Sequence, residues 1–167
     1  MTSGWRPMRV ADLPAVAAIS DAVHGAFTEA QPVYAERLAL WPEGCHILET
    51  GEGVAGYLTA HPWRLGAPPA LGAMLGTLPA PADVYYLHDI ALLPAARGTG
   101  AGAAALGLLL ESAAAARLPL IELVAVNGAD TYWRAQGFDT VAPGPYGPGS
   151  WLMRRPVNAP RSSKTAS

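Results

Sequence analysis

Two stretches of the sequence carry residues that could do chemistry. The first, "ARGTGAGAAALG", is rich in glycine and leads directly into a leucine-rich stretch. Glycines let the backbone approach a ligand closely, and successive N–H groups at a helix start attract an anion such as a phosphate. The second, "YYLHDIALL", places His88 and Asp89 in the centre of an apolar run. A histidine there can accept a proton near neutral pH, and the aspartate can orient it or bind a cationic amine.

Three known types of phosphate-binding loop can be compared with the glycine-rich loop. A Walker phosphate loop requires a lysine, and this loop has none. A dinucleotide fingerprint matches the glycines, but the loop does not turn directly off its strand, and the acidic residue at the expected distance, Glu122, lies inside a strand-like run. That assignment is therefore disfavoured. The third pattern, Arg97-x-x-Gly100-x-Gly102, needs no lysine because backbone amides bind the anion.

The segment "RGTGAG" resembles the signature with which the GCN5-related N-acetyltransferase (GNAT) family holds the pyrophosphate of acetyl-CoA. The preceding "DIALLP" is similar to the family's strand end and proline, and "NGADTYWRAQGF" supplies Asn127 and Gly137-Phe138 of its second motif. "MRVADLPAVAAI" resembles the family's opening strand and helix. The resemblance spans residues 5–155 and implies a single α/β domain. Its mixed central sheet is expected to have about six to seven strands with a V-shaped splay, flanked by about four helices.

The resemblance also implies the cofactor contacts. The backbone of Ile90, Ala91 and Leu92 is expected to run beside the pantetheine arm of acetyl-CoA, the expected acyl donor. Asn127 is expected to contact the cofactor, although an asparagine after a strand also favours a turn. The expected pyrophosphate cradle consists of Arg97, Gly98, Thr99, Gly100, Ala101 and Gly102.

One position departs from the family pattern. Many members carry a tyrosine four residues before the Gly-Phe pair, where it protonates the leaving thiolate; here that residue is Trp133. Indole is a very poor proton source, so we expect Trp133 to pack against the cofactor, or the thiolate to take its proton elsewhere. Tyr132 is adjacent, but neighbouring helix residues point about 100° apart.

His88 is the expected general base or substrate ligand, with Asp89 orienting it or binding the cationic amine. Strand periodicity places the two on opposite faces, and a bulge, common beside active sites, would rotate one of them. The alternative is a buried His–Asp pair with a structural role. His61 is the second candidate and an expected substrate contact. No role is assigned to His24 or His46, and the spacing of the histidines predicts no metal site.

The elements that must position these residues follow from the hydrophobic pattern. Asp12 is the expected N-cap of a first helix, and "PVYAERLALW" predicts a second. A hairpin over residues 45–63, a loop over 64–83 and a strand at "DVYYLHDIALLP" follow. A helix after the glycine-rich loop, the strand "PLIELVAV", a short helix and two strands complete the order. Residues 1–155 are the expected domain, and 156–167 a disordered tail.

Composition sets the remaining bounds. The 167 residues fit one domain, and a 51% hydrophobic content provides a sizeable core. A net charge of -2 gives no reason to expect nucleic acid or an anionic membrane as partner. Cys45 is the single cysteine and is expected to be a core residue. We expect a cytoplasmic protein, monomeric or homodimeric, because neither a signal pattern nor a membrane-spanning run is present.

The expected function is transfer of an acetyl group from acetyl-CoA to a primary amine of a small molecule, directly and without a covalent enzyme intermediate. The acceptor site is expected to be shaped by the first two helices, the loop over residues 64–83 and the C-terminal hairpin. These segments contain few carboxylates, which favours a mono-amine or amino-acid-like acceptor over a polycation. Two alternatives stay open: a non-catalytic acyl-CoA sensor, which the missing tyrosine keeps open, and a protein N-terminal acetyltransferase.

Overall fold

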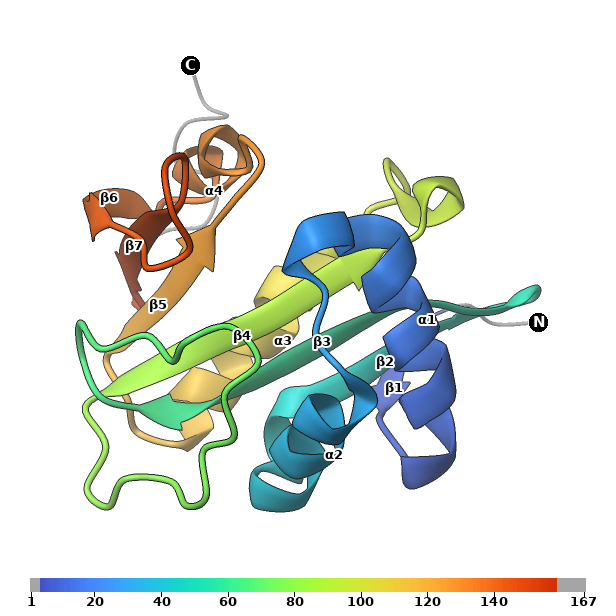
Figure 1. The fold of residues 1–167 in the computed structure, drawn as a ribbon, viewed down its shortest axis with the longest axis horizontal. Helices are drawn as coiled ribbons and strands as arrows, with labels where there is room; N and C mark the ends of the chain where they lie inside the picture. Colours follow the sequence, from blue (N-terminus) through green and yellow to red (C-terminus); the bar gives the residue numbers. More distant parts are fainter. Residues whose placement is uncertain (1–3, 159–167) are drawn as a thin grey trace.

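A seven-stranded mixed sheet in the order β1-β2-β3-β4-β5-β7-β6 forms the centre of the molecule (Figure 1). The computed structural model describes residues 4–158. The strands are β1 (Gly4–Pro7), β2 (Cys45–Thr50), β3 (Gly53–Trp63), β4 (Val84–Leu92), β5 (Leu120–Ala125), β6 (Asp139–Pro143) and β7 (Trp151–Pro156). The α-helices are α1 (Leu13–His24), α2 (Gln31–Leu40), α3 (Ala101–Ala115) and α4 (Asp130–Ala135). The predicted fold class is confirmed.

The helices form where the apolar spacing predicts them. On α3 the residues Ala105, Leu106, Leu109 and Ala113 are buried, which is the stripe of a helix lying on a sheet. α1 begins with a proline in its first turn, where the missing N–H is harmless. Asp12 occupies the predicted N-cap position of α1, but its side chain makes no capping hydrogen bond to the helix. Its carboxylate instead accepts hydrogen bonds from the Arg6 guanidinium and the Arg9 N–H.

The helices divide between the two faces of the sheet. In Figure 1, α1 and α2 lie in front of β2, β3 and β4, and α3 lies behind them. One buried cluster joins α3 to β4 and β5, and a second joins α1 and α2 to β2 and β3. Cys45 belongs to the second cluster, and burial raises the pKa of its thiol to about 12. Its predicted role as a core residue is confirmed.

A β-bulge in β4 reverses the strand's alternation. Asp89 pairs with Thr59 and Leu87 with Ala60, so His88 is an extra residue between two paired positions. Before the bulge, Leu87 packs in the α3 cluster; beyond it, Ala91 packs in the cluster of α1 and α2. The bulge raised in the sequence analysis is therefore present and strict alternation does not hold, so both side chains lie toward α1 and α2.

The sheet opens between β4 and β5. These strands run parallel and pair only from Tyr85 with Ile121 to Leu87 with Leu123. Beyond Leu87 no pairing of β4 with β5 occurs in the described part of the chain, and the strands separate into a V (Figure 1). The edge of β4 inside this V presents backbone groups that a bound ligand can pair with.

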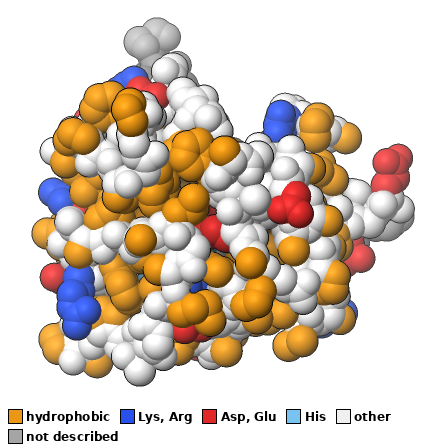
Figure 2. All heavy atoms as spheres, viewed as in Figure 1, with side chains coloured by type: hydrophobic (Ala, Val, Ile, Leu, Met, Phe, Trp, Pro, Cys, Tyr) orange, Lys and Arg blue, Asp and Glu red, His pale blue; other side chains and the backbone are white. Residues whose placement is uncertain are grey.

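Near its C-terminal end, the described chain is still held by the sheet and the residues beside it. β7 extends to Pro156 and the Val157 N–H donates to the carbonyl of Pro119, while the rest of the predicted tail, 159–167, lies outside the described residues. Within residues 4–158, no helix combines the length and apolar character required to cross a bilayer. Figure 2 shows a face with many hydrophobic side chains and few charged ones between them.

Candidate functional site

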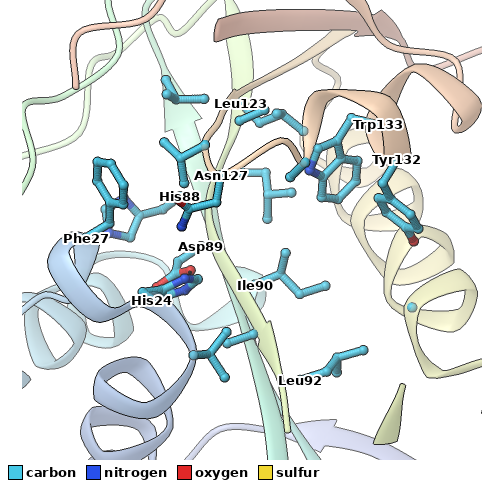
Figure 3. A pocket seen from close by; sticks show the side chains of 18 of the residues that line it. His24, Phe27, His88, Asp89, Ile90, Leu92, Leu123, Asn127, Tyr132 and Trp133 are labelled. Carbon is cyan, nitrogen blue, oxygen red and sulfur yellow. Dashed lines mark hydrogen bonds and ion pairs between the residues drawn. The ribbon is translucent and has the colours of Figure 1, made fainter. Parts of the chain in front are cut away.

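A cavity of about 730 Å³ occupies the opening between β4 and β5 (Figure 3). Its walls come from elements far apart in the sequence. They are Leu87–Leu92 of β4, Leu123–Asn127 at the end of β5, Arg97, Gly98 and Gly102 before and within α3, Ala129, Tyr132 and Trp133 at α4, and Val23, His24, Phe27, Glu29, Leu71 and Tyr146. The cavity thus has a glycine-rich end and an end with carboxylates and histidines.

The glycine-rich end has the geometry of an anion site. Gly98 and Gly100 have φ of 75° and 90°, a region that other residues enter only with strain. Thr99 closes the turn by donating from Oγ1 to the carbonyl of Ala96 at 2.6 Å. α3 begins directly after Gly100, so its unpaired N–H groups and positive end lie at this turn.

The expected pyrophosphate cradle lies around this turn. Arg97, Gly98 and Gly102 line the cavity, and Thr99, Gly100 and Ala101 form the turn that connects them. At Gly102 a Cβ atom would lie 3.0 Å from the hydroxyl of Tyr132, so the helix approaches α4 closely here.

The wall of β4 matches the expected path of the pantetheine arm. Ile90, Ala91 and Leu92 all line the cavity and face the diverging end of β5. On its other edge the same stretch is paired with β3, which holds the backbone in place. A long amide-containing ligand can therefore lie along the open edge as an added strand.

Asn127 and α4 form the opposite wall. Asn127 has a φ of 56° and lines the cavity, so the turn geometry and a cavity position occur together. Trp133 is 9% exposed and packs edge-on against Phe138, with ring centroids 5.4 Å apart. Tyr132 also lines the cavity, although helical spacing alone predicts that it points elsewhere.

Asp89, at the end of the cavity with the carboxylates and histidines, contacts three other side chains. One carboxylate oxygen is 2.6 Å from Nε2 of His24, and the other accepts hydrogen bonds from the hydroxyls of Tyr34 and Tyr57, each at 2.6 Å. Burial raises the pKa of Asp89, but the hydrogen bond and charge of His24 outweigh it, so the net shift is downward. The carboxylate stays ionised and fixed.

His88 pairs with the carboxylate of Glu29 and not with that of its sequence neighbour Asp89. Its Nε2 lies 2.7 Å from Oε1 of Glu29, and Oε2 of Glu29 accepts the N–H of Gly72 at 2.7 Å. The expected His88–Asp89 pair is not formed, because the bulge directs the two side chains to different partners. Only 2% of the His88 side chain is exposed, and its Nδ1 is buried without a partner in the described part of the chain.

His24 is a site residue to which the sequence analysis assigned no role, and Glu29, the partner of His88, is another. His24 is the last residue of α1, lines the cavity and bonds to a residue 65 positions away. A histidine at a helix end is common, and no local pattern marks this partner. His61 and His46 do not line the cavity; His61 is 1% exposed, and burial lowers its pKa to about 3.

Three segments meet over the end of the cavity that holds the carboxylates and histidines. The ring of Phe27, after α1, lies 6.2 Å from the ring of Tyr146 in the β6–β7 turn. The Tyr146 hydroxyl donates to the carbonyl of Pro69 in the loop over residues 64–83. The same loop is tied down by Glu36, whose carboxylate accepts N–H groups at 2.7 and 2.8 Å, and by Glu29.

Among residues 4–158, no group of three or more His, Cys, Asp or Glu side chains is arranged to hold a metal ion.

Known proteins share this architecture. A sequence model of the acetyltransferase (GNAT) family matches residues 15–138. Ard1 from Thermoplasma volcanium has a similar structure (TM-score 0.72, 16% identity, 95% of this chain and 100% of that one). So do the ribosomal-protein-S18-alanine N-acetyltransferase from Escherichia coli (0.66, 17%, 95% and 96%) and the loading GNATL domain of CurA from Lyngbya majuscula (0.74, 16%, 94% and 98%). No curated protein matches significantly.

Proposed function

The chain belongs to the acetyltransferase (GNAT) family, and we propose that it transfers an acetyl group from acetyl-CoA directly to the primary amine of a small molecule. One observation carries this proposal. A single cavity joins a helix-start anion site to a buried cluster of carboxylates and histidines, with an open strand edge between them. That order matches the pyrophosphate, the pantetheine arm and the acceptor amine of an acyl-transfer complex.

The donor would be held mainly by backbone groups. The N–H groups that follow Gly100 would bind the pyrophosphate, and the edge of β4 at Ile90–Leu92 would pair with the pantetheine amides. Asn127 and Trp133 would contact the arm from the opposite wall. An N–H of the Ile90–Leu92 stretch would stabilise the oxyanion formed at the thioester carbonyl.

The end of the cavity with the carboxylates and histidines, called the acceptor end from here on, supplies a negative charge and a candidate base for an amine. An alkyl ammonium has a pKa near ~10 and must lose a proton before it attacks the thioester. Asp89 and Glu29 give this end the negative charge that attracts the cation, and His24 and His88 provide ring nitrogens beside them. The negative field disfavours an acceptor that carries its own carboxylate next to the amine.

The closure of this end supports a small acceptor. One similar structure is a ribosomal-protein-S18-alanine N-acetyltransferase, and another is the NatC complex bound to a Gag peptide and CoA, so some proteins with this fold admit a protein or a peptide. Here the contacts of Tyr146 with Phe27 and Pro69 bridge the segments over the cavity, and Leu71 lines the cavity. A peptide would have to break these contacts, whereas a small amine would not.

The direct test is a panel of amines assayed for CoA release with acetyl-CoA. The panel contains small apolar monoamines, amino acids, polyamines and short peptides. We expect turnover with small monoamines and none with peptides. Acetyl-CoA binding without CoA release for any amine would favour the non-catalytic sensor, and turnover with peptides alone would favour an N-terminal acetyltransferase.

A further inference from the structure

We propose that His24 is the general base that takes the proton from the acceptor ammonium, with Asp89 as the carboxylate that orients it. The inference rests on the proposed acyl transfer and concerns which side chain handles the proton. It assigns catalysis to a residue at the end of α1 and changes the role of Asp89 from partner of His88 to partner of His24.

The accessibility of the two histidines distinguishes them. The His24 side chain is 18% exposed and the His88 side chain 2%, although both lie at the cavity. Nδ1 of His88 is buried beyond the reach of a solvent-sized molecule. A base must come within hydrogen-bond distance of the proton it removes, and the more exposed ring of His24 at the cavity meets this requirement better than the ring of His88.

The hydrogen bond to Asp89 fixes the tautomer of His24. When the ring is neutral, Nε2–H donates to the ionised carboxylate at 2.6 Å, so Nδ1 carries the lone pair. Within residues 4–158 no group hydrogen-bonds that Nδ1. A base held by a carboxylate, with its second nitrogen left for the substrate, has the arrangement of catalytic histidines in general.

Asp89 is itself held on two further sides. Tyr34 on α2 and Tyr57 on β3 both donate to its second oxygen. Burial and the nearby Asp89 charge raise the pKa of both phenols, so both remain protonated donors at physiological pH. Four elements thus fix the geometry of the pair: α1, α2, β3 and β4.

The charges around His24 make it a stronger base than a free imidazole. Burial lowers its pKa, but the hydrogen bond and charge of Asp89 and the charge of Glu29 outweigh it, giving a net rise. The last turn of α1 favours the imidazolium in the same direction. The phenols of Tyr34 and Tyr57 beside Asp89 are protonated and uncharged, and His88 is hydrogen-bonded to Glu29.

The proton balance is simple. The ammonium gives one proton to Nδ1 of His24 and becomes a neutral amine. Its nitrogen attacks the thioester carbonyl, the C–N bond forms and the C–S bond breaks. The nitrogen then loses a second proton, and the departing thiolate of CoA takes up one proton and becomes a thiol. The net products are the N-acetyl amine, free CoA and one proton, which His24 returns to solvent.

His88 then has a positioning role. Glu29 links its ring to the N–H of Gly72 in the loop over residues 64–83, so the pair ties that loop to β4. Loss of His88 is expected to loosen the closure over the acceptor and raise KM for the amine, with a smaller effect on kcat. Loss of His24 is expected to lower kcat.

The test compares histidine variants over a pH series, with 2-phenylethylamine as probe amine and CoA release as readout. For the wild type, kcat/KM is expected to rise with pH through a pKa above the ordinary ~6.5, because the base works when deprotonated. His24→Gln is expected to flatten that limb and cost ~10²–10⁴-fold. His46→Gln, outside the cavity, is the matched control and is expected to keep the wild-type profile. Asp89→Asn is expected to move the limb to lower pH.

A second measurement does not depend on activity. NMR of the wild-type imidazole nitrogens is expected to show His24 titrating above the ordinary value, with Nε2 protonated in the neutral form. An unchanged pH limb in a folded His24→Gln protein, or a His24 that titrates below the ordinary value, would overturn the base assignment while the proposed function stands. Absence of CoA release from the wild type with every amine of the panel would refute the proposed function and the base role together.

Discussion

Gly100→Ala tests whether the turn before α3 binds the pyrophosphate. Gly100 has a φ of 90°, and a Cβ built there meets nothing within 4 Å, so the substitution adds backbone strain without an internal clash. The strain is about 1–2 kcal/mol for a residue with a side chain. Gly53, the first residue of β3 and away from the cavity, has a φ of 110° and equally open surroundings. Gly53→Ala is therefore a matched control with a similar loss of stability.

The two variants should differ in ligand affinity. Hydrogen bonds to a charged group contribute about 1.5–3 kcal/mol each, so displacement of one N–H contact corresponds to a loss of about 10- to 150-fold in Kd. Titration calorimetry with acetyl-CoA is expected to show this loss for Gly100→Ala and wild-type affinity for Gly53→Ala. Circular dichroism checks that both remain folded. Equal affinity of a folded Gly100→Ala protein would refute the assignment of this turn to the pyrophosphate.

Three further variants test other parts of the account. Trp133→Phe should lower kcat less than about tenfold, because indole is not a proton source; a loss of several orders of magnitude with unchanged acetyl-CoA affinity would contradict this. Tyr146→Phe removes the hydrogen bond to the Pro69 carbonyl and should raise KM for the small amine with kcat nearly unchanged, as steady-state kinetics will show. Leu109→Ala empties a 2% exposed site under α3 and should cost about 2–5 kcal/mol in chemical unfolding; a cost below 1 kcal/mol would contradict its placement in the core.

The elements of the fold were largely predictable because each leaves a local pattern. The stripe of α3 and the uninterrupted apolar run of β5 identify a helix over a sheet, and the glycines before α3 identify the turn. The cavity-lining positions of Ile90–Leu92, Arg97 and Asn127 also agree with the motif-based expectation. These inferences depend on residues close together in the sequence.

The pairing of the titratable groups was not predictable, because it depends on long-range geometry. A one-residue bulge at His88 leaves no composition signal, yet it decides which face Asp89 occupies. His24 and Glu29 lie near the end of α1 and reach β4 only through the packing of α1 and α2 on the sheet. The closure by Tyr146 likewise joins loops 77 positions apart.

The most direct test of the central claim is mass spectrometry of the acceptor after incubation with acetyl-CoA labelled with ¹³C in the acetyl group. We expect the wild type to convert a small monoamine of the panel to its labelled N-acetyl derivative with one equivalent of free CoA. Gly100→Ala should form the same product at a reduced rate when acetyl-CoA is limiting. Tight binding of acetyl-CoA with no labelled product from any amine, peptides included, would contradict the claim that this cavity transfers acyl groups.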